Sequence, residues 1–145
     1  MHYTQYLADH VDLLKQFKAA IPKYPPYQLS LSELTEADQA FMSALDALCE
    51  TTEHSEQFSA QGQWLVDRIV MSYDHLLPFF SRDLLWFFGN SSLHYMSDEE
   101  IHFYQQLDEL RHAAASQDRP FDIIEAKTFL NQQHTTTTPD PKDQA

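Results

Sequence analysis

The stretch LLPFFSRDLLWFFG, from Leu76 to Gly89, determines how the rest of the chain must be arranged. It holds four Phe, four Leu and one Trp, so a short helix built from it has no fully polar face. It is too short to span a bilayer, and Arg82 and Asp83 in its middle would make burial in lipid costly. We therefore expect a central helix over residues 78–88 that other helices, or a second subunit, cover.

The composition indicates one folded domain without disulfides. The chain has 145 residues, of which ten are Phe, seven Tyr and two Trp, and this supports a substantial core. Only two Gly occur, which argues against a turn-rich sandwich and against glycine-rich phosphate loops. Cys49 is the single cysteine, and no signal peptide or run of eighteen apolar residues is visible. We expect a cytoplasmic protein.

The charge is strongly negative and unevenly placed. The formal net charge is −13. No Lys or Arg occurs between Tyr24 and Asp67, a segment that contains Glu33, Glu36, Asp38, Asp46, Glu50, Glu53, Glu56 and Asp67. Such a surface repels phosphate backbones and anionic lipids, so we expect no binding to nucleic acid or to membranes. A basic protein partner is compatible with this charge.

The apolar periodicity predicts an all-α fold, a single-domain bundle of about six helices around the central helix. The domain covers residues 1–133, and residues 134–145 form a disordered tail because they carry no apolar anchor. The expected helices are 3–21, then 32 or 35 to 54, one from the break at 52–56 to 77, 78–88, 97–115 and 122–133. The proline-containing segment 23–32 should be extended. Pro78 either kinks one long helix or begins a new one.

Local signals support several of these boundaries. Ser97 and Glu100 have the spacing of a capping box, and Asp122 can cap the last helix. Gly89 predicts a helix stop of the left-handed type. Gly62 lies on the apolar face of its helix, which suggests the close approach of a neighbouring backbone.

Two sets of residues have metal-like spacing, but neither predicts a metal site. The first set is two Glu-x-x-His pairs on one helix, whose phase places them on the solvent side: Glu99 with His102, and Glu109 with His112. The second set lacks the further Cys or His ligands that zinc prefers: Glu50, Glu53 and His54. We therefore expect no bound metal and no cofactor.

Nothing in the sequence predicts a catalytic residue. Ser81, Ser91 and Ser92 lack the glycine-flanked elbow of nucleophilic serines. Cys49 lies on an apolar stripe, where a thiol stays protonated.

Three polar residues are predicted to be buried, namely His10, Arg82 and Asp83. His10 lies between Leu7 and Leu14 on an apolar stripe, as a hydrogen-bonded neutral imidazole or as a proton switch. A buried Arg82 needs a carboxylate partner, such as Asp74 or one on another helix. The alternative is that Arg82 lines a binding site or an interface together with His75, Trp86 and His94.

Three hypotheses about function follow. The first is a protein-interaction or homodimerising protein without catalytic activity, because the aromatic excess around residues 78–88 is hard to cover with six short helices. The second is a ligand- or cofactor-binding bundle, possibly an enzyme, with a pocket between the third, fourth and fifth helices near Tyr73, Arg82, Trp86 and Tyr95. The third is an acidic decoy that binds a basic protein.

Overall fold

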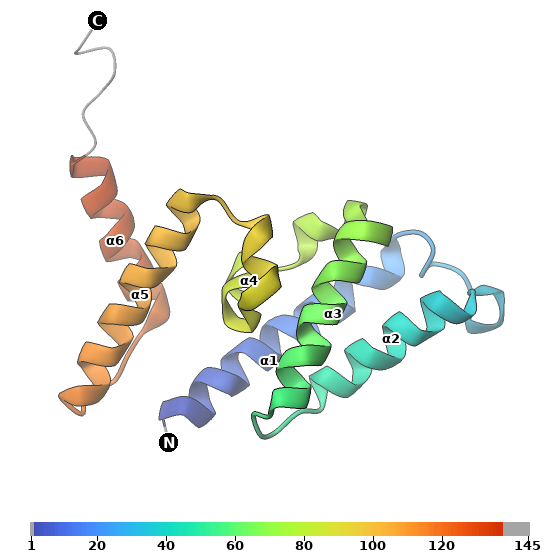
Figure 1. The fold of residues 1–145 in the computed structure, drawn as a ribbon, viewed down its shortest axis with the longest axis horizontal. Coiled ribbons are helices and arrows are strands. Elements are labelled where there is room, and N and C mark those ends of the chain that lie inside the picture. Colours follow the sequence, from blue (N-terminus) through green and yellow to red (C-terminus); the bar gives the residue numbers. More distant parts are fainter. Residues whose placement is uncertain (1, 138–145) are drawn as a thin grey trace, which may run out of the picture. The chain divides into compact units, whose positions relative to one another are not determined.

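The computed structural model describes residues 2–137, and of residues 2–4, 90 and 133–137 only the backbone. Within this range the regular elements are all helical, so the predicted all-α fold is confirmed (Figure 1). They are α1 (His2–Ala20), η1 (Ile21–Lys23), η2 (Leu31–Glu33), α2 (Glu36–Cys49), α3 (Glu56–Ser72), η3 (Asp74–Phe79), α4 (Arg82–Phe88), η4 (Asn90–Tyr95), α5 (Asp98–Ser116) and α6 (Ile123–Thr137), where η denotes a 3-10 helix.

The chain divides into two compact units, residues 1–96 and 97–145. The expectation of one domain over residues 1–133 stays a prediction. None of the helices in the described range combines the length and the apolar character needed to cross a bilayer.

The core of the first unit is built by four α-helices. α1 packs against α2 and α4, and α3 also packs against α2 and α4. Burying each large apolar side chain contributes about 1.5–3 kcal/mol relative to leaving it exposed. The largest fully buried side chains are Leu14, Phe17, Ile21, Phe41, Leu45, Leu65, Val66, Ile69, Leu76, Phe80, Leu84 and Leu85.

The central apolar stretch forms two short helices instead of one. Pro78 lies inside the 3-10 helix η3, and α4 begins only at Arg82, four residues later than predicted. The Ser81 hydroxyl accepts a hydrogen bond from the backbone N–H of Asp83 at 3.2 Å, which caps the start of α4. The helical structure is interrupted at Phe80, whose backbone is extended, so Pro78 neither kinks one long helix nor begins a new one.

The segment after α1 is a compact turn, so the prediction of an extended segment was wrong. The Leu29 N–H donates to the Pro26 carbonyl at 3.0 Å, and the Tyr24 ring stacks on Phe79 at 4.6 Å. Tyr27 is buried and donates its hydroxyl proton to the Asp38 carbonyl at 3.0 Å.

A second buried tyrosine joins this contact. The Tyr73 hydroxyl donates to the Asp38 carboxylate at 2.5 Å, and the Tyr73 ring lies 4.7 Å from Phe41. Burial is the main cause that raises the pKa of both Tyr27 and Tyr73. The two hydroxyls thus fasten the turn and the end of α3 to the start of α2.

The second unit contains α5 and α6. As predicted, the Ser97 hydroxyl accepts from the Glu100 N–H at 3.1 Å, and the Glu100 carboxylate accepts from the Ser97 N–H. The Asp122 carboxylate accepts from the first backbone N–H groups of α6, including that of Ile124 at 2.9 Å. α6 runs to Thr137, four residues past the predicted boundary at 133, and the rest of the predicted tail, 138–145, lies outside the described residues.

Candidate functional site

A neutral groove of about 800 Å³ runs between α2 and α3, and we call it the α2–α3 groove. Small residues line it along α2, and Trp64 and Gln61 border it on α3. The lining includes no charged side chain. Its residues are Ala40, Ser43, Ala44, Ala47, Leu48, Thr51, Ser55, Gln57, Phe58, Ala60, Gln61 and Trp64.

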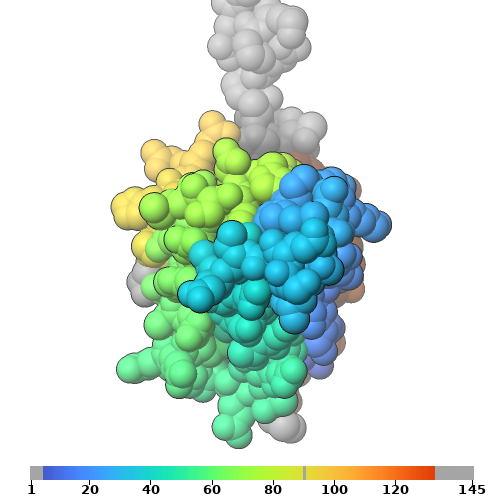
Figure 2. All heavy atoms as spheres, turned by 90° about the vertical axis from the view of Figure 1, so that its right-hand side faces the viewer, coloured from blue at the N-terminus to red at the C-terminus, as the bar shows by residue number. Residues whose placement is uncertain are grey.

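Two capped helix ends position this groove. The Thr35 hydroxyl accepts from the Asp38 N–H at 3.1 Å at the start of α2, and the Ser55 hydroxyl accepts from the Phe58 N–H at 3.0 Å at the start of α3. The short connection over residues 50–55 keeps the helices neighbours. Figure 2 shows their surfaces side by side on one face of the first unit, in the cyan-to-green part of the chain.

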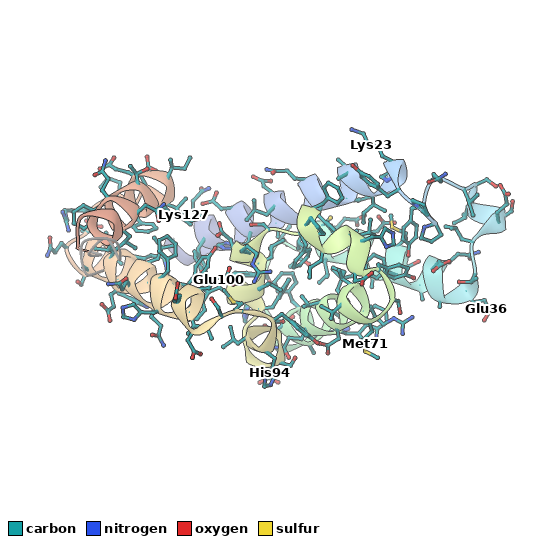
Figure 3. The ribbon with its side chains drawn as sticks, turned by 90° about the horizontal axis from the view of Figure 1, so that it is seen from above. Lys23, Glu36, Met71, His94, Glu100 and Lys127 are labelled. Carbon is teal, nitrogen blue, oxygen red and sulfur yellow. The ribbon has the colours of Figure 1, made fainter. Side chains whose placement is uncertain are left out.

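Two large apolar side chains on α3 are left exposed. Trp64 is 41% exposed and Met71 is 77% exposed. They lie seven residues apart, two helical turns, and therefore on the same side of α3. Figure 3 shows Met71 directed away from the core. Exposed apolar surface beside a groove is typical of an interaction site.

The charges near the groove are acidic. Glu36 lies one turn before Ala40 on α2, and Glu53 and Glu56 lie where the chain passes from α2 to α3. All three are exposed, and within residues 2–137 none of them forms an ion pair.

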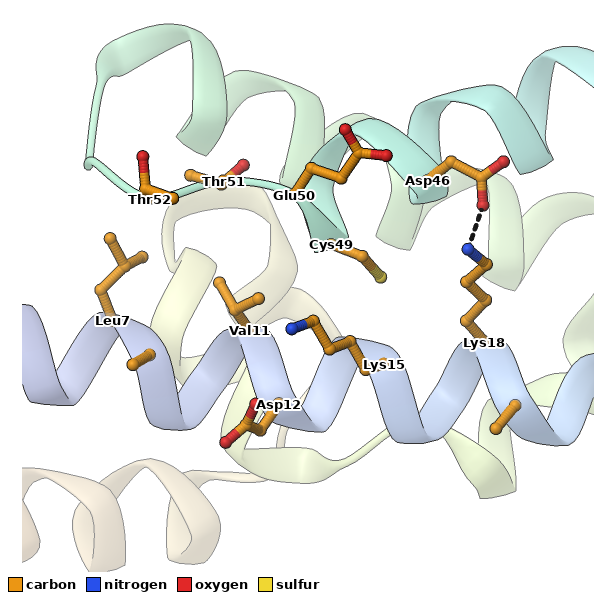
Figure 4. Close-up of a pocket in the computed structure, with 12 residues that line it drawn as sticks. Leu7, Val11, Asp12, Lys15, Lys18, Asp46, Cys49, Glu50, Thr51 and Thr52 are labelled. Carbon is orange, nitrogen blue, oxygen red and sulfur yellow. Dashed lines mark ion pairs between the residues drawn. The ribbon is translucent and has the colours of Figure 1, made fainter.

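A second open cavity of about 890 Å³ lies between α1 and α2 (Figure 4). Lys18 Nζ lies 2.7 Å from Asp46 Oδ1 across it, and Cys49 points from α2 towards α1. Burial raises the pKa of the Cys49 thiol, Lys18 opposes this rise, and Asp46 adds to it. The cavity therefore holds a protonated thiol and an ion pair, not an activated nucleophile.

The structure places Arg82 and Trp86 one turn apart on α4, both half-buried. The Arg82 guanidinium donates to the Tyr95 carbonyl at 2.8 Å, and its pairing with a carboxylate stays a prediction. Arg82 also lines a cavity of about 420 Å³ beside η3, which His75, Trp86 and His94 do not line.

The two predicted site histidines are exposed and belong to different regions. His75 donates from Nε2 to the Pro25 carbonyl at 2.6 Å, which ties η3 to the turn after α1. His94 lies on η4 with its side chain in solvent (Figure 3).

Of the three predicted buried polar residues, His10 is 3% exposed, and Arg82 and Asp83 are half-buried because they begin a short helix at the edge of the core. The His10 Nδ1–H donates to the Tyr6 carbonyl at 2.7 Å. Its ring stacks on Phe87 at 4.2 Å, so the imidazole joins α1 to α4.

The residues with metal-like spacing are dispersed. Glu99, His102, Glu109 and His112 are all exposed on α5, and Glu50, Glu53 and His54 are exposed after α2. Within the described range, no three His, Cys, Asp or Glu side chains come close enough together to hold one metal ion.

Trp64 and the small residues of α2 were not among the predicted site residues. The buried face of α3 includes Phe58, Leu65 and Ile69, and the exposed Trp64 lies outside it. The sequence did contain a pattern that points to this exposed face: Trp64 and Met71 are seven residues apart, which places them on one side of α3.

The comparisons with known proteins give one match. A family model described as PA2817-like matches residues 2–139. No curated protein matches the chain. No solved structure matches it.

Proposed function

The chain belongs to the PA2817-like family, and we propose that it acts by association, with another protein or with a second copy, rather than by catalysing a reaction. The single observation that carries this proposal is the α2–α3 groove with Trp64 exposed at its border. Tryptophan is enriched among the residues that dominate binding energy at interfaces.

The arrangement of the groove also supports association. Its lining is neutral and mostly small or apolar, and apolar Met71 extends the exposed surface along α3. A partner that covers this surface removes apolar area from water, at about 25 cal/mol per Å² before the costs of association.

Site-specific photo-crosslinking in cells tests this proposal. A benzophenone amino acid replaces Trp64 in one variant and Gln105, an exposed residue of α5, in the control variant. We expect a protein adduct from position 64 and none from position 105. Native mass spectrometry of the untagged protein then shows whether a second copy is the partner. A strictly monomeric protein without adducts at position 64 contradicts the proposal.

A second candidate function is binding of a small ligand, and the cavity between α1 and α2 favours it. Its lining combines apolar Leu7 and Val11 with Lys15, Thr51 and Thr52, a mixture that suits a partly polar ligand. In this case native mass spectrometry shows a discrete added mass, and Val11→Trp, which fills the cavity, removes it.

A further inference from the structure

The α2–α3 groove suits one kind of partner, and we infer that it binds a basic amphipathic helix of another protein. This inference rests on the proposed function, because it identifies the partner of the same groove. Ala40, Ala44 and Ala47 lie three or four residues apart, so they form one stripe of small side chains along α2. Small residues along this stripe let a helix of the partner protein approach α2 closely. The larger side chains of that helix would then lie against Trp64.

The length of the groove fits a short helix. Its α2 wall runs from Ala40 to Leu48, which corresponds to about 12 Å at the helical rise per residue. About two turns of a partner helix would therefore lie in the groove. Such a helix presents two or three aliphatic side chains to the lining and leaves its flanks for polar contacts.

The charge around the groove selects a basic partner. Every lining residue lies between Ala40 and Trp64, within the segment that has no Lys or Arg. The exposed carboxylates of Glu36, Glu53 and Glu56 lie close to its two ends without ion pairs in the described range. Lys or Arg residues on the flanks of a partner helix would meet these carboxylates, which steers association and fixes orientation.

The nearby cations do not neutralise the carboxylates beside the α2–α3 groove. Lys18 is held by Asp46 on the α1 side of α2, facing the other cavity. Arg68, which follows Trp64 by one turn on α3, is half-buried and lowers the pKa of Tyr27 and Tyr73. Its charge therefore acts on the buried tyrosine pair.

The same charge argues against a second copy in this groove. Two chains related by a twofold axis would bring the same surface of each molecule together. Their Glu36, Glu53 and Glu56 carboxylates would then face one another, and like charges across an interface are unfavourable. An acidic or uncharged helix would gain nothing from these carboxylates.

A designed peptide tests the inference directly. The probe is an eighteen-residue synthetic helix with leucines on one face and lysines on the other. The reporter is the fluorescence of Trp64 in a Trp86→Phe background, so that one tryptophan remains. We expect binding that changes Trp64 fluorescence and weakens by about tenfold between 20 and 200 mM salt, because ion pairs at an exposed rim are screened. A Leu/Glu helix of the same length should not bind.

Matched variants locate the binding. Ala47→Gln puts a neutral side chain into the groove, and Ala113→Gln makes the same change at an exposed position of α5. The combined change of Glu36, Glu53 and Glu56 to Gln removes the groove charges, and its control changes the exposed Glu99, Glu109 and Glu125 to Gln. We expect each groove variant to weaken peptide binding about tenfold and each control to change it less than twofold.

Four outcomes would overturn the inference. If the groove charge variant and its control weaken peptide binding equally, the peptide is attracted to the acidic surface in general and not to the groove. A dimer that Ala47→Gln dissociates means that a second copy occupies the groove, and the proposed function then survives. Adducts at position 64 without any binding of the Leu/Lys helix mean that the partner is not a basic helix. The proposed function of association with another protein then survives. Absence of both adducts and peptide binding removes the inference and the proposed function together.

Discussion

The ring of Phe88, on α4, occupies the space that Gly62, on α3, leaves by having no side chain. A Cβ built on Gly62 would overlap three atoms of this ring, which is 4% exposed. The Phe88 carbonyl also accepts a hydrogen bond from the Gln63 side chain at 3.0 Å. The close approach expected at Gly62 is therefore made by a side chain and not by a backbone, and it sets how near α3 and α4 lie.

We predict that Gly62→Ala destabilises the protein. Overpacking costs about 1–3 kcal/mol, and the better helix propensity of Ala returns only about 1 kcal/mol. The packing term should dominate because the buried ring cannot move into solvent. Urea unfolding followed by circular dichroism measures the change. Phe88→Leu should be less damaging in the Gly62→Ala background than in the wild type; additive effects would contradict this explanation.

Gly89→Ala should also destabilise the protein, for a different reason. Gly89 ends α4 with φ +66° and ψ −155°, a conformation almost confined to glycine. A Cβ there would meet only the Trp86 carbonyl at 3.7 Å, so space is not the obstacle. We expect a loss of about 1–3 kcal/mol from backbone strain. Thermal unfolding measures it, and Phe88→Leu should give no rescue.

Stability should fall at alkaline pH because of the buried tyrosines. Burial and the contact with Asp38 raise the pKa of Tyr73 above its ordinary value of 10.0, and burial raises that of Tyr27 as well. Above pH 10 the unfolded chain releases these protons while the folded chain keeps them. Stability from this source is therefore complete below pH 10 and decreases as the pH rises through the folded-state pKa values.

The Tyr73→Phe variant checks this assignment. It should lose about 1 kcal/mol at pH 7, because a hydrogen bond to Asp38 is removed. Between pH 9.5 and 11 its unfolding free energy should fall less steeply than that of the wild type. Equal slopes for the two proteins would show that other groups cause the alkaline loss.

Cys49 should react slowly in the folded protein. It is 6% exposed, and burial raises the pKa of its thiol, so little thiolate is present at pH 8. We expect labelling with a disulfide reagent at least about tenfold slower than in urea-unfolded protein. Fast labelling in native buffer would show that the cavity between α1 and α2 opens readily.

Sequence patterns located the helices best where the signal is local. The first helix was expected over 3–21 and forms over His2–Ala20, because its apolar stripe and Pro22 act within a few residues. The Ser97 cap and the Asp122 cap were also found, since each uses a side chain to satisfy backbone groups nearby.

The central stretch shows where sequence patterns fail. Its apolar residues predicted one helix over residues 78–88, but η3 ends at Phe79 and α4 begins only at Arg82, with the backbone of Phe80 extended between them. The α2–α3 groove was out of reach for a related reason. Its existence depends on how far apart the walls bearing Ala44 and Trp64 lie, and a single sequence does not encode that distance in any local pattern.

The packing of α1 has a consequence for the order in which the chain can fold during synthesis. His10 stacks on Phe87, and Phe17 meets the edge of Phe80 at 5.0 Å between ring centres. The first helix to be synthesised therefore finds its aromatic partners only after most of the first unit has been made. α2 can cover part of the apolar stripe of α1 earlier, but the part that packs on α4 stays exposed until then, so we expect a nascent chain that ends before α4 to need a chaperone most.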